Sequence, residues 1–161
     1  MKILLILTGF LGVGLQFYYY SLLSEAVANH FGSGGNANGW MSNTAHLLLN
    51  CGMFIFLSAL FLAVPVILRK SPMSLVNLPK KSYWLAPERK EAFIPIIANW
   101  ILFIGVMANI FLLFVNYLVF LANQTSPPRL SQPLFLTGLS IFIGITLLWV
   151  IALFVKFNKT D

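Results

Sequence analysis

Long apolar runs separated by short polar segments dominate the chain of 161 residues. Four of them are long enough to cross a bilayer, because a helix rises about 1.5 Å per residue and the hydrocarbon core is about 30 Å thick. They cover residues 3–23, 44–68, 93–122 and 135–155. The pattern predicts one all-α integral membrane domain over residues 1–161, a bundle of four transmembrane helices. Because the third run is longer than one crossing requires, we expect it to tilt or to extend past the bilayer.

The first run has an alternative interpretation as a secretory signal. Lys2 precedes the apolar stretch, and Ala26-Val27-Ala28 has the small side chains of a cleavage site. However, the run is about twice as long as a typical signal core. It also ends in the bulky aromatic residues 17–20. A retained first span is therefore the favoured prediction.

Composition supports a bilayer as the medium in which the chain folds. Only 9% of the residues are charged and 15% are aromatic, whereas about 25% of the residues of a soluble domain are charged. Cys51 is the only cysteine, so no intrachain disulfide can form.

Basic residues predict the orientation in the membrane. Of the ten lysines and arginines, all except Arg129 fall on one side of a four-span path. Because cytoplasmic loops carry an excess of Lys and Arg, we expect both termini and the 69–92 loop to face the cytoplasm. The 24–43 and 123–134 loops should then lie outside. Insertion and anionic headgroups account for the net charge of +6, so nucleic acid is not an expected partner.

The predicted cytoplasmic loop contains an aromatic pair between basic residues. Tyr83 and Trp84 are adjacent, and Arg89 follows them. Aromatic rings flanked by cations are typical of a segment at the headgroup level. Two interpretations remain open, a basic interfacial linker and a docking surface for a cytosolic or membrane partner.

Scattered amides inside the spans predict a polar layer. Gln16, Asn50 and Asn116 lie about 9–11 Å below the outer ends of three different helices. His46 precedes Asn50 by one turn, and Asn109 lies two turns below Asn116. We expect these amides to point inward and to bond across helices, either as interhelical contacts or as the floor of a small cavity open to the outside.

The spans contain no Asp, Glu, Lys or Arg, which argues against ion-coupled transport, proton relays and voltage sensing. Small residues instead predict close helix contacts in all four spans. The glycines concerned are Gly9, Gly12, Gly14, Gly52, Gly105, Gly138 and Gly144.

The predicted outer loop is rich in glycine and asparagine. Asn38-Gly39 is its clearest turn dipeptide. The candidate binding residues are His30, Phe31, Trp40 and His46. The two histidines and Glu25 lack the close spacing of a zinc motif, so we expect neither a metal nor a cofactor. The chain also lacks a nucleophile with a placed base, a phosphate-binding motif and a carboxylate pair, so no enzymatic activity is predicted.

Two segments resemble a known family. One has His30-Phe31, a glycine-containing turn, Gly39-Trp40 and Ser42, and the other runs from Asn77-Leu78-Pro79 to Arg89. With the spans around them, about residues 1–95, they are similar to a bacterial membrane domain of unknown function. That domain also forms the N-terminal part of the immunity protein of the sporulation-delaying toxin system.

The resemblance implies a multi-pass protein of the bacterial cytoplasmic (inner) membrane, and only loosely a role in immunity or signalling. The chain departs from the family pattern in three places, which removes charge from the outer loop. Ser24 stands where the family often has Pro, Asn43 where it often has Lys, and Asn36 and Asn38 near its frequent Asp.

These features predict a non-enzymatic integral membrane protein. Its outer loop, with a polar notch beneath it, would contact a peptide, lipid or protein partner, as in immunity or envelope sensing. The alternative is an accessory structural subunit of a larger membrane protein complex, whose glycines and aromatic residues contact other chains. A membrane enzyme acting on lipid has the least support from the residues.

Overall fold

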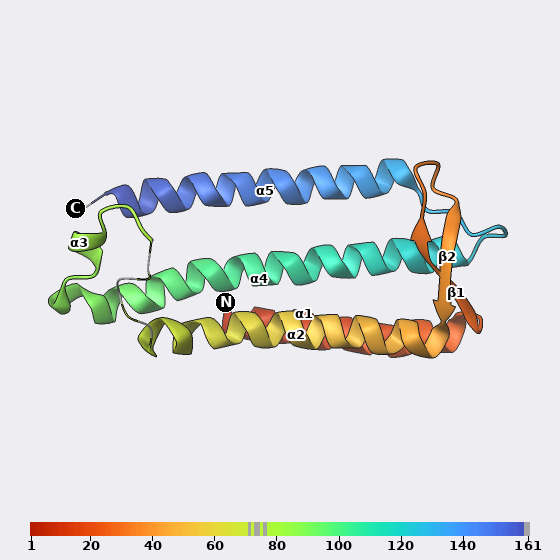
Figure 1. Cartoon of the computed structure of the whole chain (residues 1–161), viewed down its shortest axis with the longest axis horizontal. Coiled ribbons are helices and arrows are strands. Elements are labelled where there is room, and N and C mark those ends of the chain that lie inside the picture. Colours follow the sequence, from red (N-terminus) through yellow and green to blue (C-terminus); the bar gives the residue numbers. More distant parts are fainter. Residues whose placement is uncertain (71, 73–74, 76, 160–161) are drawn as a thin grey trace.

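Four long helices lie roughly side by side in the computed structural model, which describes residues 1–70, 72, 75 and 77–159 (Figure 1). They are α1 (Lys2–Leu22), α2 (Asn43–Lys70), α4 (Pro87–Asn123) and α5 (Gln132–Asn158). All four are long and apolar enough to cross a membrane. The four predicted spans are thus confirmed as helices.

The predicted 69–92 loop is shorter than expected because α2 and α4 both extend into it. A short helix, α3 (Lys81–Trp84), occupies part of what remains. Residues 71, 73, 74 and 76 of this loop lie outside the described part of the chain. Pro87 is the first residue of α4, a position where its missing N–H removes no helical hydrogen bond.

The prediction of an all-α chain is wrong in the first outer loop, which forms a β-hairpin. Strands β1 (Ala26–Phe31) and β2 (Ala37–Ser42) pair antiparallel, with Ala26 opposite Ser42 and Phe31 opposite Ala37. The register is irregular between Ala28 and Phe31.

The tight turn predicted within residues 32–39 lies over residues 32–36 and not at Asn38-Gly39, the clearest turn dipeptide of that stretch. Gly32 N donates to Asn36 O over 2.9 Å, and Gly35 adopts a φ of 77°. Glycine reaches this left-handed conformation without steric cost. Gly39 lies inside β2, where an added Cβ would approach His30 Cβ to 2.9 Å. Its role is therefore to let the strands approach closely at the irregular register.

Helices α1, α2 and α4 pack against one another and form the core of the bundle. Leu5, Leu102 and Val106 are buried there. Glycines permit the closest approaches: a Cβ on Gly12 would lie 2.3 Å from Phe54 Cδ1, and one on Gly105 would lie 2.6 Å from Phe61 Cγ.

Three other glycines that were expected at helix contacts do not lie at one. Gly14, Gly52 and Gly144 have no atom within 4 Å of an added Cβ. Gly14 and Gly52 are exposed on the surface of the helices.

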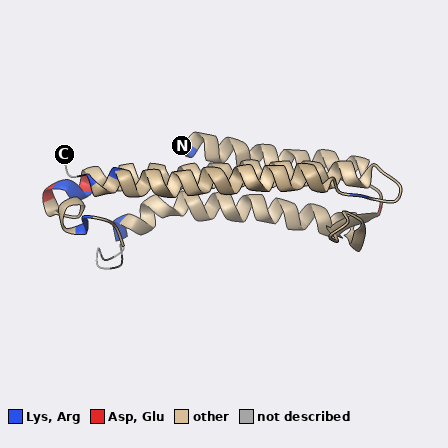
Figure 2. Ribbon diagram, turned by 90° about the horizontal axis from the view of Figure 1, so that it is seen from above, with Lys and Arg blue, Asp and Glu red and all other residues tan. Residues whose placement is uncertain are grey.

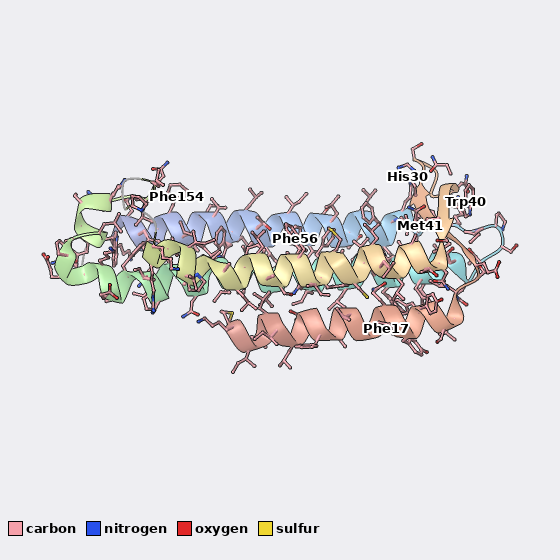
Figure 3. The ribbon with its side chains drawn as sticks, turned by 60° about the horizontal axis from the view of Figure 1, so that its bottom comes forward. Phe17, His30, Trp40, Met41, Phe56 and Phe154 are labelled. Atoms are coloured by element: carbon pink, nitrogen blue, oxygen red, sulfur yellow. The ribbon has the colours of Figure 1, made fainter. Side chains whose placement is uncertain are left out.

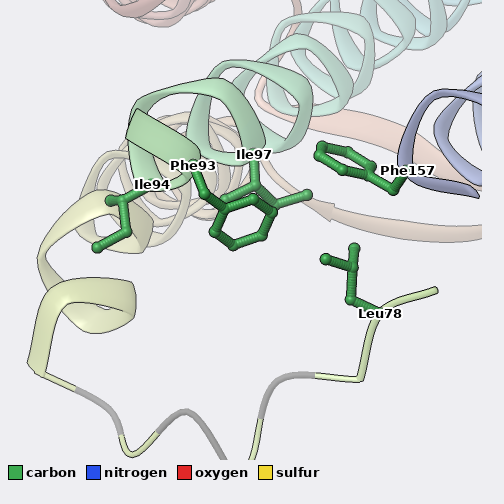
Figure 4. Close-up of a cluster of buried hydrophobic side chains, with 5 residues drawn as sticks. All are labelled: Leu78, Phe93, Ile94, Ile97 and Phe157. Atoms are coloured by element: carbon green, nitrogen blue, oxygen red, sulfur yellow. The ribbon is translucent and has the colours of Figure 1, made fainter. Parts of the chain in front are cut away.

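Helix α5 packs mainly on α4, through aromatic side chains. Phe142 stacks on Phe111 with ring centroids 4.6 Å apart. Trp149 Nε1 donates to Trp100 O over 3.0 Å. Near the end of α5, Phe157 joins a buried cluster with α4 and the segment that follows α2 (Figure 4). The members of this cluster are Leu78, Phe93, Ile94, Ile97 and Phe157.

The two ends of the bundle differ in charge. Lys and Arg gather at one end, here called the basic end, and the hairpin lies at the other, the hairpin end (Figure 2). The basic end carries Arg69, Lys70, Lys80, Lys81, Arg89, Lys90, Lys156 and Lys159. The last turn of α5 lies at the basic end, whereas the start of α1 lies part-way along the bundle (Figure 1).

Candidate functional site

The hairpin is attached to the bundle at its base and along β1. Ala28 N donates to Asn123 Oδ1 over 2.8 Å, and Asn123 Nδ2 donates to Ala28 O over 2.9 Å. At the base, Asn43 Nδ2 donates to Tyr20 O and Leu23 O at the end of α1. Because Val27 and Ala28 are fully buried, β1 is the strand that faces the bundle most closely.

The tip of the hairpin is attached to the loop between α4 and α5. Leu130 N donates to Gly35 O over 2.8 Å, and Ala37 N donates to Pro128 O over 3.2 Å. These bonds form an isolated antiparallel bridge between Asn36 and Arg129. Gln132 Nε2, in the first turn of α5, also donates to Gly32 O. The hairpin is therefore fixed to α4, to the loop that follows α4 and to α5, and its base lies where α2 is bonded to the end of α1.

Two of the candidate binding residues are exposed on this fixed hairpin. The side chain of Trp40 is 55% exposed, and His30 is also exposed (Figure 3). His30 Nδ1 donates to Asn38 Oδ1, since an amide oxygen can only accept. This bond orients the imidazole from the opposite strand.

The other two candidates do not join this surface. Phe31 is half-buried, and His46 is buried in the first turns of α2. Asn50 Nδ2 lies 3.4 Å from both ring nitrogens of His46. The structure therefore pairs His46 with the amide layer and separates it from the exposed hairpin residues.

The amides of the predicted polar layer are buried or half-buried, but two of them bond within their own helices. Gln16 and Asn116 are buried, and Asn50 is half-buried. Asn50 Nδ2 donates to His46 O, and Asn116 Nδ2 donates to Leu112 O. The expected interhelical bonds of these two amides are not formed. Within the described residues, Gln16 Nε2 is buried and has no hydrogen-bond partner.

Asn109 is the amide that bridges helices. It is completely buried, and its Nδ2 donates to Thr8 Oγ1 over 3.3 Å and to Ser58 Oγ over 3.1 Å. Neither hydroxyl partner was predicted from the sequence. Thr8 lies eight residues before Gln16, and Ser58 lies eight residues after Asn50. This spacing in the sequence was the signal that could have identified the two hydroxyl groups.

A cavity of about 480 Å³ lies at the hairpin end, but the polar layer does not form its floor. Its walls come from Gly34 of the hairpin turn and from the segment between α4 and α5, including Thr125, Arg129 and Ser131. The predicted notch under the hairpin and this cavity are thus different features.

The aromatic pair at the basic end makes contacts within the protein. Trp84 Nε1 donates to Phe157 O over 2.8 Å, and the Trp84 ring meets the Phe157 ring edge-on. Arg89 Cζ lies 4.1 Å from the centroid of the Tyr83 ring. Trp84 therefore attaches α3 to the last turn of α5.

The hairpin end presents an aromatic ring, an imidazole and strand backbone. Within the described residues, no group of three or more His, Cys, Asp or Glu side chains could hold a metal ion. No family model, curated protein or solved structure matches this chain.

Proposed function

We propose that this chain is a non-enzymatic, multi-pass protein of the bacterial cytoplasmic membrane whose hairpin binds an extracytoplasmic peptide or protein. The observation that carries the proposal is the exposure of Trp40, at 55%, on a hairpin fixed to α4 and α5. Large aromatic side chains on rigid supports contribute most strongly to protein recognition, because little entropy is lost when they bind.

The charge distribution supports this orientation. Basic residues favour the cytoplasmic side of a membrane, so the basic end would face the cytoplasm and the hairpin would face outward. Arg129 and Glu25 are the charged residues at the hairpin end, and their formal charges cancel. A partner would therefore be recognised there mainly by aromatic and backbone contacts.

The outer edge of β2 offers backbone hydrogen-bonding groups to which a peptide could bind. The sheet has two strands, so β2 is an edge strand. In the described part of the chain, no backbone hydrogen bond from outside the hairpin reaches residues 38–42. An extended peptide can pair with such an edge while Trp40 contacts its side chains. The bridge between Asn36 and Arg129 supports this, because an extended segment already pairs just before β2.

The resemblance of residues 1–95 to the bacterial membrane domain described above favours immunity or envelope sensing as the biological setting. A second candidate is an accessory subunit of a larger membrane complex. It is supported by Gly14 and Gly52, which are exposed on α1 and α2 and would let another helix approach closely.

Co-purification from native membranes in mild detergent tests the proposal. We expect Trp40→Ala, alone or with His30→Ala, to lose a partner that the wild type retains. Phe17 and Phe56 are equally exposed aromatic residues on α1 and α2, at 59% and 62%. Their alanine variants are matched controls and should retain the partner (Figure 3).

The same experiment separates the two candidates. If the partner survives both hairpin changes but is lost on Gly14→Leu or Gly52→Leu, the chain is a subunit that associates through its helices. If neither set of variants changes a stoichiometric association, the hairpin is not a recognition element.

A further inference from the structure

Two neighbouring cavities lie in the half of the bundle nearer the basic end, beside the first turn of α1. The first, about 640 Å³, lies between α1, the last turns of α2 and the first half of α4. The second, about 500 Å³, lies between α4 and α5. Met1 and Asn99 line both cavities, so the two spaces meet at these residues.

The first cavity is basic. Lys2 and Arg69 are the charged residues in its wall, and Pro65, Ile94 and Leu102 supply apolar surface. No acidic residue lines either cavity. Among the described residues, neither Lys2 nor Arg69 has an acidic partner. Two cations thus face an open space without a counter-charge.

The second cavity is an open groove with an apolar wall. Its wall includes the rings of Trp100, Phe103 and Trp149 and the side chains of Leu148 and Ala152. The hydrogen bond from Trp149 Nε1 to Trp100 O joins the two helices that form the groove.

The depth of Lys2 places the basic cavity at the level of lipid headgroups. Along α1, Lys2 is about 30 Å from Leu22 at the hairpin end, which equals the thickness of a hydrocarbon core. Helix α4 extends much farther and carries Arg89 and Lys90 about 20 Å beyond this level. Lys2 and Arg69 are therefore placed to meet a lipid phosphate, whereas the distant cations are not.

We propose that the two cavities form one binding site for an anionic phospholipid of the leaflet at the basic end. Lys2 and Arg69 bind the headgroup phosphate, and Asn99 lies where headgroup and chain meet. One acyl chain occupies the groove between α4 and α5. Charge complementarity selects an anionic lipid, and the apolar groove selects a ligand with a long chain. The site lies at the opposite end from the hairpin and is independent of its proposed partner.

Native mass spectrometry of the purified full chain in detergent tests this site, with dioleoyl-phosphatidylglycerol and dioleoyl-phosphatidylcholine as probes. We expect the wild type to retain one phosphatidylglycerol and to retain phosphatidylcholine poorly. The double variant Lys2→Gln with Arg69→Gln should bind phosphatidylglycerol roughly 20-fold more weakly, since each cation near an anionic lipid contributes several-fold. Ala152→Phe, which fills the groove without changing charge, should also weaken retention.

A control double variant removes two positive charges from positions outside the two cavities. Lys70 is next to Arg69 but lines neither cavity, and Lys90 lies farther from the bilayer. Lys70→Gln with Lys90→Gln should keep the lipid. Equal loss in both double variants, or equal retention of the two lipids by the wild type, would overturn the site.

Inorganic phosphate distinguishes a lipid from a free anion. We expect millimolar phosphate to leave the melting temperature in detergent unchanged and phosphatidylglycerol to raise it. If phosphate alone raises it as much, the ligand is a free anion and the lipid assignment is wrong. Circular dichroism of each variant without lipid checks that its helical content is that of the wild type.

Discussion

Asn123 pairs with Ala28 as a neighbouring strand would. Ala28 N donates to Asn123 Oδ1 over 2.8 Å, and Asn123 Nδ2 donates back to Ala28 O over 2.9 Å. The amide belongs to the last residue of α4, 95 positions away along the chain. The position of the hairpin is therefore set directly by a membrane-spanning helix.

Loss of this pair should loosen β1. We expect Asn123→Leu to leave the backbone groups of Ala28 without partners and to lower the free energy of local opening by about 1–3 kcal/mol. Amide hydrogen exchange at Ala28 would then become faster. Gln124→Leu is the matched control, because Gln124 is exposed and its side chain makes no hydrogen bond in the described structure. Unchanged exchange at Ala28 would show that Asn123 does not hold the strand.

The contact between Gly12 and Phe54 should tolerate no added methyl group. A Cβ on Gly12 would lie 2.3–2.6 Å from three atoms of the Phe54 ring, which is completely buried and has little room to move. We expect Gly12→Ala to destabilise the protein by about 1–3 kcal/mol through overpacking. Thermal unfolding in detergent measures this.

Gly14 provides the control for this change on the same helix. An added Cβ there meets nothing within 4 Å, so Gly14→Ala should leave the melting temperature unchanged or slightly higher. Equal destabilisation by both variants would mean that α1 does not pack on α2 through the Gly12 face.

The four spans were predictable because their length and low polarity are dictated by the bilayer. Which glycine faces another helix was not predictable, since lipid is as apolar as the protein interior and hydrophobic periodicity does not distinguish the two. Gly12 and Gly14 illustrate this, as only the first lies at a contact.

The β-hairpin could not be predicted from the sequence, for a different reason. Its position depends on Asn123 and on the bridge to Arg129, which are distant in sequence and visible only in the fold. Asn38-Gly39 has the residue types of a turn, but Gly39 lies inside β2, opposite His30, where the strand register is irregular. The depth of the amides follows from residue counting, whereas their bonding partners depend on rotamers. Asn50 consequently bonds to its own helix and Asn109 to two others.

Asn109 should contribute more to stability than Asn50. Its amide bridges Thr8 and Ser58, whereas Asn50 donates to a carbonyl of its own helix. We expect Asn109→Leu to lower the melting temperature more than Asn50→Leu. A double-mutant cycle between Asn109→Leu and Ser58→Ala should give a coupling energy of about 0.6–2 kcal/mol. Zero coupling would mean that the two side chains act independently.

The stacked rings of Phe111 and Phe142 should hold α5 on α4. Their centroids are 4.6 Å apart with an interplanar angle of 13°. Because α5 has no buried residue along its most apolar stretch, few other contacts can replace this one. We expect Phe142→Ala to destabilise the association of α5 by about 1–3 kcal/mol, from lost packing and lost aromatic contact.

Phe154 lies on the same helix and is 56% exposed, so Phe154→Ala is the matched control and should have little effect on that association. Limited proteolysis in detergent, within the segment between α4 and α5, reports how often α5 separates from α4. Phe142→Ala should increase the cleavage rate over that of the wild type and of Phe154→Ala. If both variants are cleaved at the wild-type rate, α5 is held elsewhere, and the contacts of Trp149 and Phe157 become the ones that fix it.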